Sequence, residues 1–189
     1  MKKETLKYKL DLQTFAENTD SGAAMRYELL SYMNVTPKAS TPQYELIGEG
    51  FTEMAETLNP QTKESGYIHQ KSKSNSITGY APTFDFTAEN YKGDPVCEYI
   101  ENIGNERLIG SDAETDIVNV LTYKKGSTDN VYEAYQQKVA IRCDQVKGGA
   151  GQDSMPLTGS LLYKGDAIKG TFNTTTKTFT ADTASTDGD

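Results

Sequence analysis

Apolar and polar residues alternate along much of the chain, which is typical of β-strands with one buried face. The alternation is strictest over residues 80–88, where Phe84 and Phe86 share one face and Asp85 lies on the other. Weaker versions of the pattern predict further strands at 44–48, 51–58, 116–123, 131–146, 157–163 and 168–172, and around Phe179. Between two of these strands, residues 60–76 are polar and predict a long loop or an exposed hairpin.

The clearest helix is predicted over residues 95–103. Asp94 is a good N-cap, Pro95 suits the first helical position, and Gly104 is a predicted stop. Four apolar residues have the spacing of one helix face: Val96, Tyr99, Ile100 and Ile103.

The chain divides into three parts. Residues 1–40 are predicted to be an N-terminal arm with a short amphipathic helix near 22–33, followed by an extended linker. Residues 41–180 contain the strands and the helix, with turns predicted at 125–127 and 164–166 and a flexible break at 148–151. Residues 181–189 are predicted to be a disordered acidic tail.

The order of elements, strands then one helix then strands, predicts the fold class. Parallel sheets need helical crossovers, and this chain offers one helix. We therefore expect a mainly β fold, an antiparallel β-sandwich or barrel with one flanking α-helix.

Charge and composition exclude some classes of function. The formal net charge is −8 and the pI about 4.8, which argues against gripping nucleic acid by its phosphates. The N-terminal lysines precede a polar stretch rather than an apolar run, and no segment has the length of a membrane span. We expect a protein made in the cytoplasm and without a membrane span.

The residues that could carry catalysis or bind a metal do not form a recognisable pattern. His69 is the single histidine, and Cys97 and Cys143 lack zinc-site spacing, so both cysteines are read as small core residues, although a disulfide between them stays open. The glycine-rich run at 148–151 lacks the lysine of a phosphate loop. Spaced carboxylates at 112–116 allow a calcium site, but the more ordinary alternative is a solvated strand edge. We expect no enzyme activity, cofactor or metal.

Several short motifs, in order, resemble a known family. Overall the chain is similar to the major tail protein, or tail tube protein, of siphophages and prophages of Gram-positive bacteria. The resemblance covers roughly residues 40–180, and its motifs lie at 48–52, 58–64, 80–82, 93–96, 110–116, 165–166 and 170–172. The opening residues 9–16 resemble the start of many phage structural proteins, capsid proteins included.

This resemblance implies a function and a set of partners. Six copies would close into a ring, rings would stack into a hollow tube, and inner strands would join into one barrel around the lumen. DNA would pass through that lumen without specific binding, and the acidic composition suits such a conduit. The implied location is the virion tail, and the implied partners are the tape measure protein and the tail terminator and initiator proteins.

Three sets of residues are candidates for this assembly. The candidates for ring-to-ring contact, in the polar segment 59–76, are Asn59, Lys63, Glu64, His69, Lys71 and Lys73. The helix residues Val96, Tyr99, Ile100 and Ile103 could contact a neighbouring subunit or, as the alternative, pack on their own sheet. The lumen-charge candidates are Asp85, Asp112, Glu114 and Asp116. The N-terminal arm is a second contact candidate.

Other functions compete with this interpretation. A head or connector protein, or the tube subunit of a contractile injection system, would share the composition. A carbohydrate-binding module would use the Tyr-rich strands as stacking faces, although the chain has no Trp. A β-sandwich hydrolase would need a nucleophile paired with a base, and no local pattern supplies that pair.

Overall fold

The structure is a computed structural model that describes residues 22–126 and 128–182. The first part of the predicted N-terminal arm, residues 1–21, and most of the predicted acidic tail lie outside the described residues. One α-helix, α1 (Pro95–Glu106), and two 3-10 helices, η2 (Arg26–Glu28) and η3 (Gly110–Ala113), accompany the strands in that part of the chain. The strands are β1 (Leu29–Asn34), β2 (Tyr44–Leu46), β3 (Phe51–Thr57), β4 (Pro60–Ser65), β5 (Ser74–Tyr80), β6 (Thr83–Glu89), β7 (Glu114–Lys125), β8 (Val131–Gln145), β9 (Pro156–Asn173) and β10 (Thr178–Ala181).

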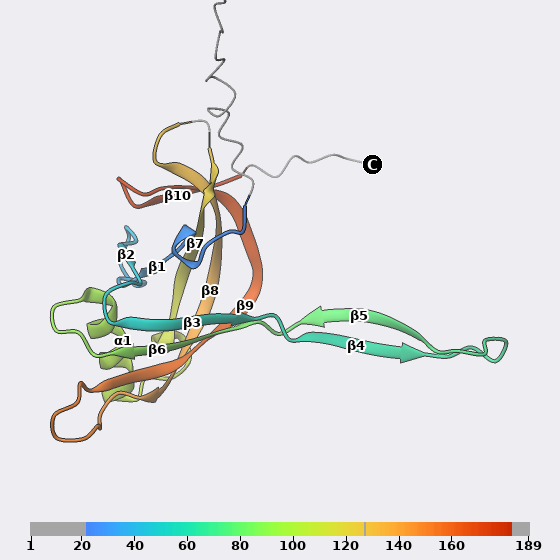
Figure 1. Cartoon of the computed structure of the whole chain (residues 1–189), viewed down its shortest axis with the longest axis horizontal. Coiled ribbons are helices and arrows are strands. Elements are labelled where there is room, and N and C mark those ends of the chain that lie inside the picture. The colour runs from blue at the N-terminus through green and yellow to red at the C-terminus, as the bar shows by residue number, and fades with distance from the viewer. Residues whose placement is uncertain (1–21, 127, 183–189) are drawn as a thin grey trace, which may run out of the picture.

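Most strands belong to one curled antiparallel sheet. Its order is β2-β1-β7-β8-β9-β6-β3, and β10 pairs with the last residues of β9. The sheet curls into a half-barrel, so the predicted mainly β fold with a single helix is confirmed (Figure 1). Strands β4 and β5 form a separate two-stranded sheet, which is the exposed hairpin allowed by the sequence at 60–76.

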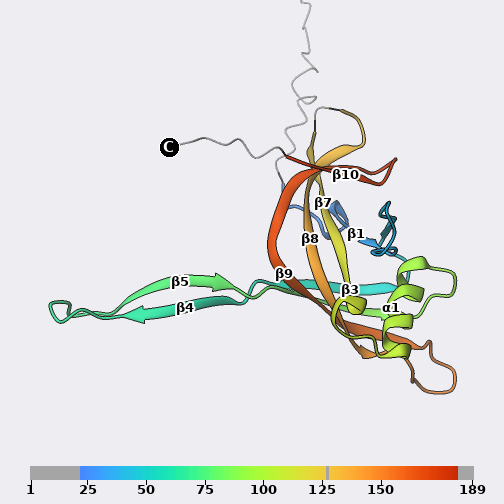
Figure 2. The same ribbon diagram turned by 180° about the vertical axis from the view of Figure 1, so that it is seen from behind.

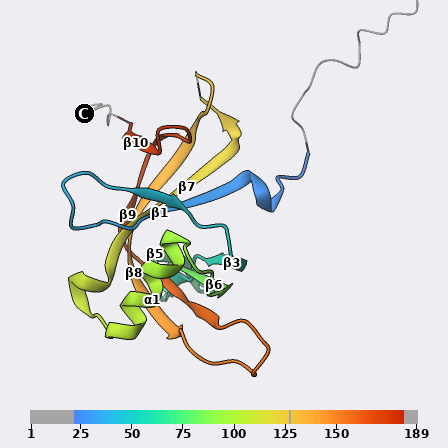
Figure 3. The ribbon, with the colours of Figure 1, turned by 90° about the vertical axis from the view of Figure 1, so that its left-hand side faces the viewer.

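The predicted helix forms, with the predicted start. The Asp94 carboxylate accepts hydrogen bonds from the backbone N–H of Val96 at 3.0 Å and of Cys97 at 2.8 Å. The predicted stop at Gly104 is wrong, because α1 continues to Glu106. Gly104 has a packing role instead, since a Cβ there would lie 2.5 Å from a methyl carbon of Val146. Figure 3 shows α1 lying in front of the sheet around β6 and β8.

Two hydrophobic cores lie on opposite faces of the sheet. Ile117 and Val118 are neighbours in β7, point to opposite faces and belong to different cores. Buried residues of the first core, beneath α1, include Phe84, Phe86, Ile117, Val139, Ile141, Leu157 and Leu161. The second core forms where β2 and β10 curl toward each other, and it contains Tyr32, Tyr44, Val118, Val120, Ala134 and Phe172.

The prediction of a short helix near 22–33 is wrong. Residues 26–28 form a single 3-10 turn and residues 29–34 form β1, which pairs with β2 on one side and β7 on the other. Met33 packs in the first core and Tyr32 in the second. A strand that is buried on both faces carries apolar residues at consecutive positions, so it lacks the alternation that marks a strand in the sequence.

The predicted turn at 164–166 is also wrong, because β9 runs without interruption from Pro156 to Asn173. Lys164 pairs with Lys138 and Ile168 with Gln136, so three residues of β9 lie opposite the single residue Gln137. Gly165 has φ +70° and lies in this irregularity. The local sequence is therefore that of a turn, but the surrounding pairs hold it as a bulge within one long strand.

Candidate assembly surfaces

The most distinctive surface is the hairpin that we call the arm, residues 59–80. Strands β4 and β5 pair with each other and with no other strand of the described residues. Figures 1 and 2 show the arm projecting from the body as a long ribbon. Nearly every residue of both strands is exposed. An isolated two-stranded hairpin is at best marginally stable in water, so the arm is built as a surface that gains from a partner.

The six arm candidates of the sequence analysis all lie on this hairpin. Two of them form an ion pair across its strands, the ammonium of Lys73 lying 2.9 Å from the carboxylate of Glu64. His69 stacks on Tyr67 in the terminal turn, with ring centroids 5.9 Å apart. Both groups are solvent-exposed, so these contacts contribute little to the stability of the fold. Their role in ring stacking stays a proposal.

The four helix candidates behave differently from the arm. Val96, Ile100 and Ile103 are buried in the first core, and Tyr99 packs against it. This is the second of the two alternatives allowed by the sequence, packing of the helix on its own sheet. The i, i+3, i+4, i+7 stripe of α1 faces β8 of the same chain, and contact of this helix with a neighbouring subunit stays a prediction.

A polar sheet surface lies on the side away from α1, and we call it the open face. Cross-strand pairs place Asp85 opposite Ser160, Ser160 opposite Arg142, and Asp116 opposite Lys138. Directly paired residues share a sheet face, and the intervening residues Phe84 and Ile141 lie in the first core. The charged residues that cross-strand pairing places on the open face are Glu53, Asp85, Glu114, Asp116, Lys138, Arg142 and Lys164. Acidic residues outnumber basic ones on it.

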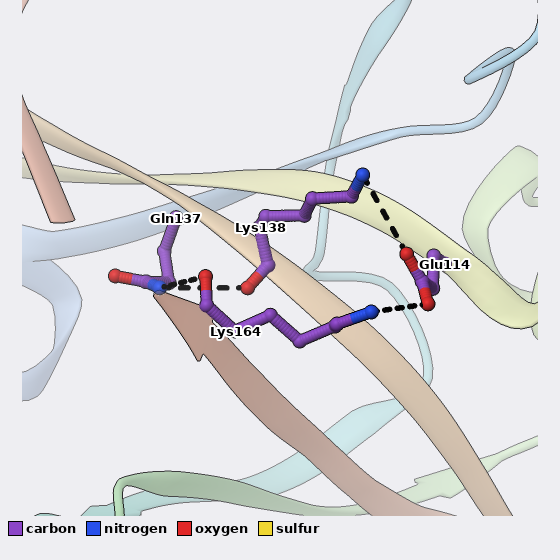
Figure 4. A network of polar contacts seen from close by, with 4 residues as sticks. All are labelled: Glu114, Gln137, Lys138 and Lys164. Atoms are coloured by element: carbon purple, nitrogen blue, oxygen red, sulfur yellow. Dashed lines mark hydrogen bonds and ion pairs between the residues drawn. The ribbon is translucent and has the colours of Figure 1, made fainter. Parts of the chain in front are cut away.

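Glu114 is the best-connected charge on the open face (Figure 4). Its carboxylate pairs with the ammonium of Lys164 and lies 3.5 Å from that of Lys138. The hydrogen bond from Lys164, aided by the charge of Lys138, lowers the pKa of Glu114. Three strands are thereby joined through one side chain. Glu114 was predicted from the sequence and the two lysines were not, although Lys138 precedes the buried Val139 in an alternating pattern.

The other lumen-charge candidates divide into two groups. Asp85 is exposed on β6, and Asp116 is half-buried on β7, where burial raises the pKa of its carboxyl. Asp112 lies in η3, before the strand begins, and its carboxylate pairs with Lys38 at 2.8 Å. Of the three spaced carboxylates at 112–116, Glu114 and Asp116 therefore lie on one side of the same strand. Asp112 lies before that strand begins.

The two cysteines pack in and against the first core and are not bonded to each other. Burial raises the pKa of both thiols, Cys97 and Cys143, to about 11, which makes them poor nucleophiles at neutral pH. No cluster of three acidic, histidine or cysteine side chains suited to a metal occurs among the described residues. Within the same residues, α1 is too short and too polar to cross a membrane.

The main sheet ends in open strand edges. Strand β3 is the last strand on one side and β2 the last on the other. Near β2 the curl is held by an ion pair between Lys177, in the turn before β10, and Glu45. The outer edge of β3 has no partner strand in the described chain, so its backbone groups are free to pair with another copy.

Comparison with known proteins extends this description. No family model matches the sequence, and no curated protein matches it. A chain from the tail of an empty GTA particle, solved with C6 symmetry, superposes with a TM-score of 0.55 at 14% identity, over 84% of this chain and 100% of that one. A chain of the anti-feeding prophage (AFP) baseplate, six-fold symmetrised, gives a TM-score of 0.44 at 12% identity, over 79% and 96% of the two chains. The first of these comparisons shows a shared fold.

Proposed function

We propose that this chain is a structural subunit of a phage-type tail tube, in which copies close into six-membered rings and the rings stack into a hollow tube. The observation that carries the proposal is the arm, a polar hairpin that extends from a curled half-barrel and whose strands pair with no other strand among the described residues. The shared fold with a chain from a C6-symmetric particle tail supports the same assignment. The role is structural rather than catalytic.

The open strand edges support ring closure. A half-barrel is an incomplete barrel with open edges. If the free edge of β3 paired with a strand of the next copy, its backbone N–H and C=O groups would form hydrogen bonds to that strand in place of those to water. A head-to-tail interface of this kind closes into a ring when the rotation per copy divides a full turn. The half-barrel body would then form the wall of the tube.

The open face is the surface that we assign to the lumen. It is polar and lies opposite the face covered by α1, and its acidic residues outnumber its basic ones. A duplex moving past such a surface meets few unpaired cations, because Lys138 and Lys164 are both engaged by Glu114. Weak binding of phosphates lets DNA pass, whereas free lysines would hold it. Asp85 and Asp116 would contribute the remaining negative charge.

The arm is the element that we assign to stacking one ring on the next. The test is to shorten it without disturbing the body. Lys63 and Ser76 are directly paired, so replacing residues 64–75 by Asn-Gly closes the hairpin with a two-residue turn. We expect this variant to fold with an unchanged circular dichroism spectrum and to form no tubes in negative-stain electron microscopy of concentrated protein, while the wild-type protein forms hollow tubes.

Two outcomes would overturn the proposal. Long tubes from the shortened variant would exclude the arm from stacking. Monomers alone from the wild-type protein, even after addition of pre-formed tail initiator complexes from a related phage, would remove the tube assignment itself. A matched control is replacement of residues 148–151, in another exposed loop, which should leave tube formation unchanged.

A further inference from the structure

An apolar groove lies between the start of β1, the end of β2 and β3. Its volume is about 520 Å³, which is large enough for one or two bulky side chains. The apolar residues lining it include Leu29, Leu46, Ile47, Phe51 and Met54. Leu46 is 40% exposed, and Tyr27 on the groove wall is 72% exposed. Exposed apolar surface gathered in one hollow marks an interaction site rather than ordinary surface.

The tip of the arm presents an exposed apolar side chain on a tight turn. The backbone N–H of Gln70 donates to the carbonyl oxygen of Tyr67 at 2.9 Å, which closes a tight turn around Ile68 and His69. Tyr67 and His69 stack on each other, and Ile68 between them is completely exposed. An isoleucine held on the outermost turn of a projecting hairpin costs solvation free energy in the monomer, and that cost is recovered when the side chain enters an apolar hollow.

The charges of the arm and the body are complementary as well. The arm has three lysines, Lys63, Lys71 and Lys73, against the single acidic residue Glu64, a net charge of +2 with His69 neutral. The whole chain has a net charge of −8, so the body is strongly acidic. At the groove, Glu53 lines the wall and Glu49 is exposed nearby. Arg26 also lines the groove, where its guanidinium donates to the carbonyl oxygen of Leu29.

The tip does not serve the groove of its own chain, because the arm points away from the body (Figures 1 and 2). We propose that the Tyr67–Ile68–His69 tip of one copy docks in the β1–β2–β3 groove of a second copy, with Ile68 in the apolar hollow and the arm lysines beside Glu49 and Glu53. This inference rests on the proposed function and names the site that receives the arm. Tip and groove are different surfaces, so each copy can donate one and accept one, and the contact propagates along an axis.

Disulfide trapping between two single variants tests this contact. We would mix Ile68→Cys with Leu46→Cys under mild oxidation and separate the products on a non-reducing gel. Cys97 and Cys143 are buried to differing degrees and have pKa values raised to about 11, so they react slowly at pH 8. The expected result is a mixed disulfide dimer that neither variant forms alone. Ile68 is fully exposed and Leu46 partly so, so both variants should fold.

The control replaces the groove cysteine by Ile109→Cys, a more accessible apolar position that is 83% exposed and lies before η3. A mixed dimer with Ile109→Cys as abundant as that with Leu46→Cys would overturn the docking, because it would mean random collision. In a further control, Leu12→Cys replaces Ile68→Cys. A disulfide between Leu12→Cys and Leu46→Cys would show that the N-terminal segment fills the groove, and this result would also overturn the docking of the tip.

A second variant separates this inference from the proposed function. Ile68→Asp should raise the concentration needed for tube formation by about tenfold, since it removes a buried isoleucine from each contact. The docking site is wrong if Ile68→Asp forms tubes as the wild-type protein does and Ile68→Cys gives no mixed disulfide with Leu46→Cys. The tube proposal is unaffected by that result. The mixed disulfide in protein that never forms tubes would support the docking and count against the tube.

Discussion

The side-chain amide of Gln137 holds the bulge of β9 by donating to the carbonyl oxygen of Lys164 at 3.1 Å and to that of Gly165 at 3.0 Å. Gln137 is buried, with 4% of its surface exposed. The amide occupies the gap left by three bulged residues opposite one. Through the bulge it also fixes the backbone position from which the Lys164 ammonium reaches Glu114 (Figure 4).

Gln137→Leu should therefore destabilise the fold. It keeps the volume of the side chain but leaves two carbonyl oxygens of the bulge without their donor, at a cost of about 2 kcal/mol in the free energy of unfolding. For a chain of this size we expect the thermal midpoint to fall by roughly 4–8 °C. Gln145→Leu, at the exposed end of the same strand, is the matched control and should shift the midpoint little. An unchanged midpoint in Gln137→Leu would contradict a supporting role for the amide.

The pairing of Glu114 with two lysines predicts a dependence of stability on pH. Its pKa is lowered from an ordinary value of 4.5, so its contribution is present above that pH and is lost as the pH falls through the lowered value. Glu114→Gln should thus reduce the thermal midpoint at neutral pH, and the difference from the wild-type protein should vanish in acid. A double-mutant cycle with Lys164→Met identifies the cause, because the effect of Glu114→Gln should shrink in that background.

Close packing at Gly104 predicts an unusual sign for a helix substitution. Exchanging glycine for alanine inside a helix normally stabilises it by up to about 1 kcal/mol. Here the new methyl group would lie 2.5 Å from Val146 Cγ1 and 3.3 Å from Cys143 Cβ, so overpacking should outweigh that gain and lower the stability by about 1 kcal/mol. Urea unfolding measures the change. Asn105→Ala, at an exposed position of the same helix, should not lower the stability of the fold. Adding Val146→Ala to Gly104→Ala should reduce the destabilisation, because it removes the methyl group that the new Cβ would contact.

The charge of the arm gives a prediction about assembly rather than folding. Reversing its three lysines with Lys63→Glu, Lys71→Glu and Lys73→Glu should leave the thermal midpoint within about 2 °C, because the side chains are exposed. Tube formation should be lost at physiological salt, since the arm would then repel the acidic body of the next copy. Sedimentation velocity distinguishes assembled from unassembled protein, and electron microscopy shows whether tubes form.

The control for this charge reversal changes the net charge equally. Lys92→Glu, Lys125→Glu and Lys147→Glu lie at exposed positions outside the arm, in the region from the loop before α1 to the loop after β8. This triple variant should still assemble. Equal loss of tubes in both triple variants would mean that overall charge, and not the arm, controls assembly.

Local patterns in the sequence were sufficient for several elements. The Asp94–Pro95 start of α1 and the alternation around Phe84 and Phe86 predicted their structures correctly, because capping and period-two burial depend on residues close together in the chain. The acidic composition and the polar, lysine-bearing segment at 60–76 could also be recognised directly from the sequence. The sequence also allowed that segment to be a hairpin, since strand and loop residues are mixed there.

Tertiary structure alone decided the rest. Residues 29–34 form a strand because β2 and β7 pair with both of its edges, and residues 164–166 form a bulge because Gln137, in another strand, fills the gap. Glu114 meets Lys164 only through the register of three strands, and the arm projects because β4 and β5 pair only with each other among the described strands. Each of these outcomes depends on contacts between residues far apart in the chain, and the free energy of such contacts is not encoded in any local pattern.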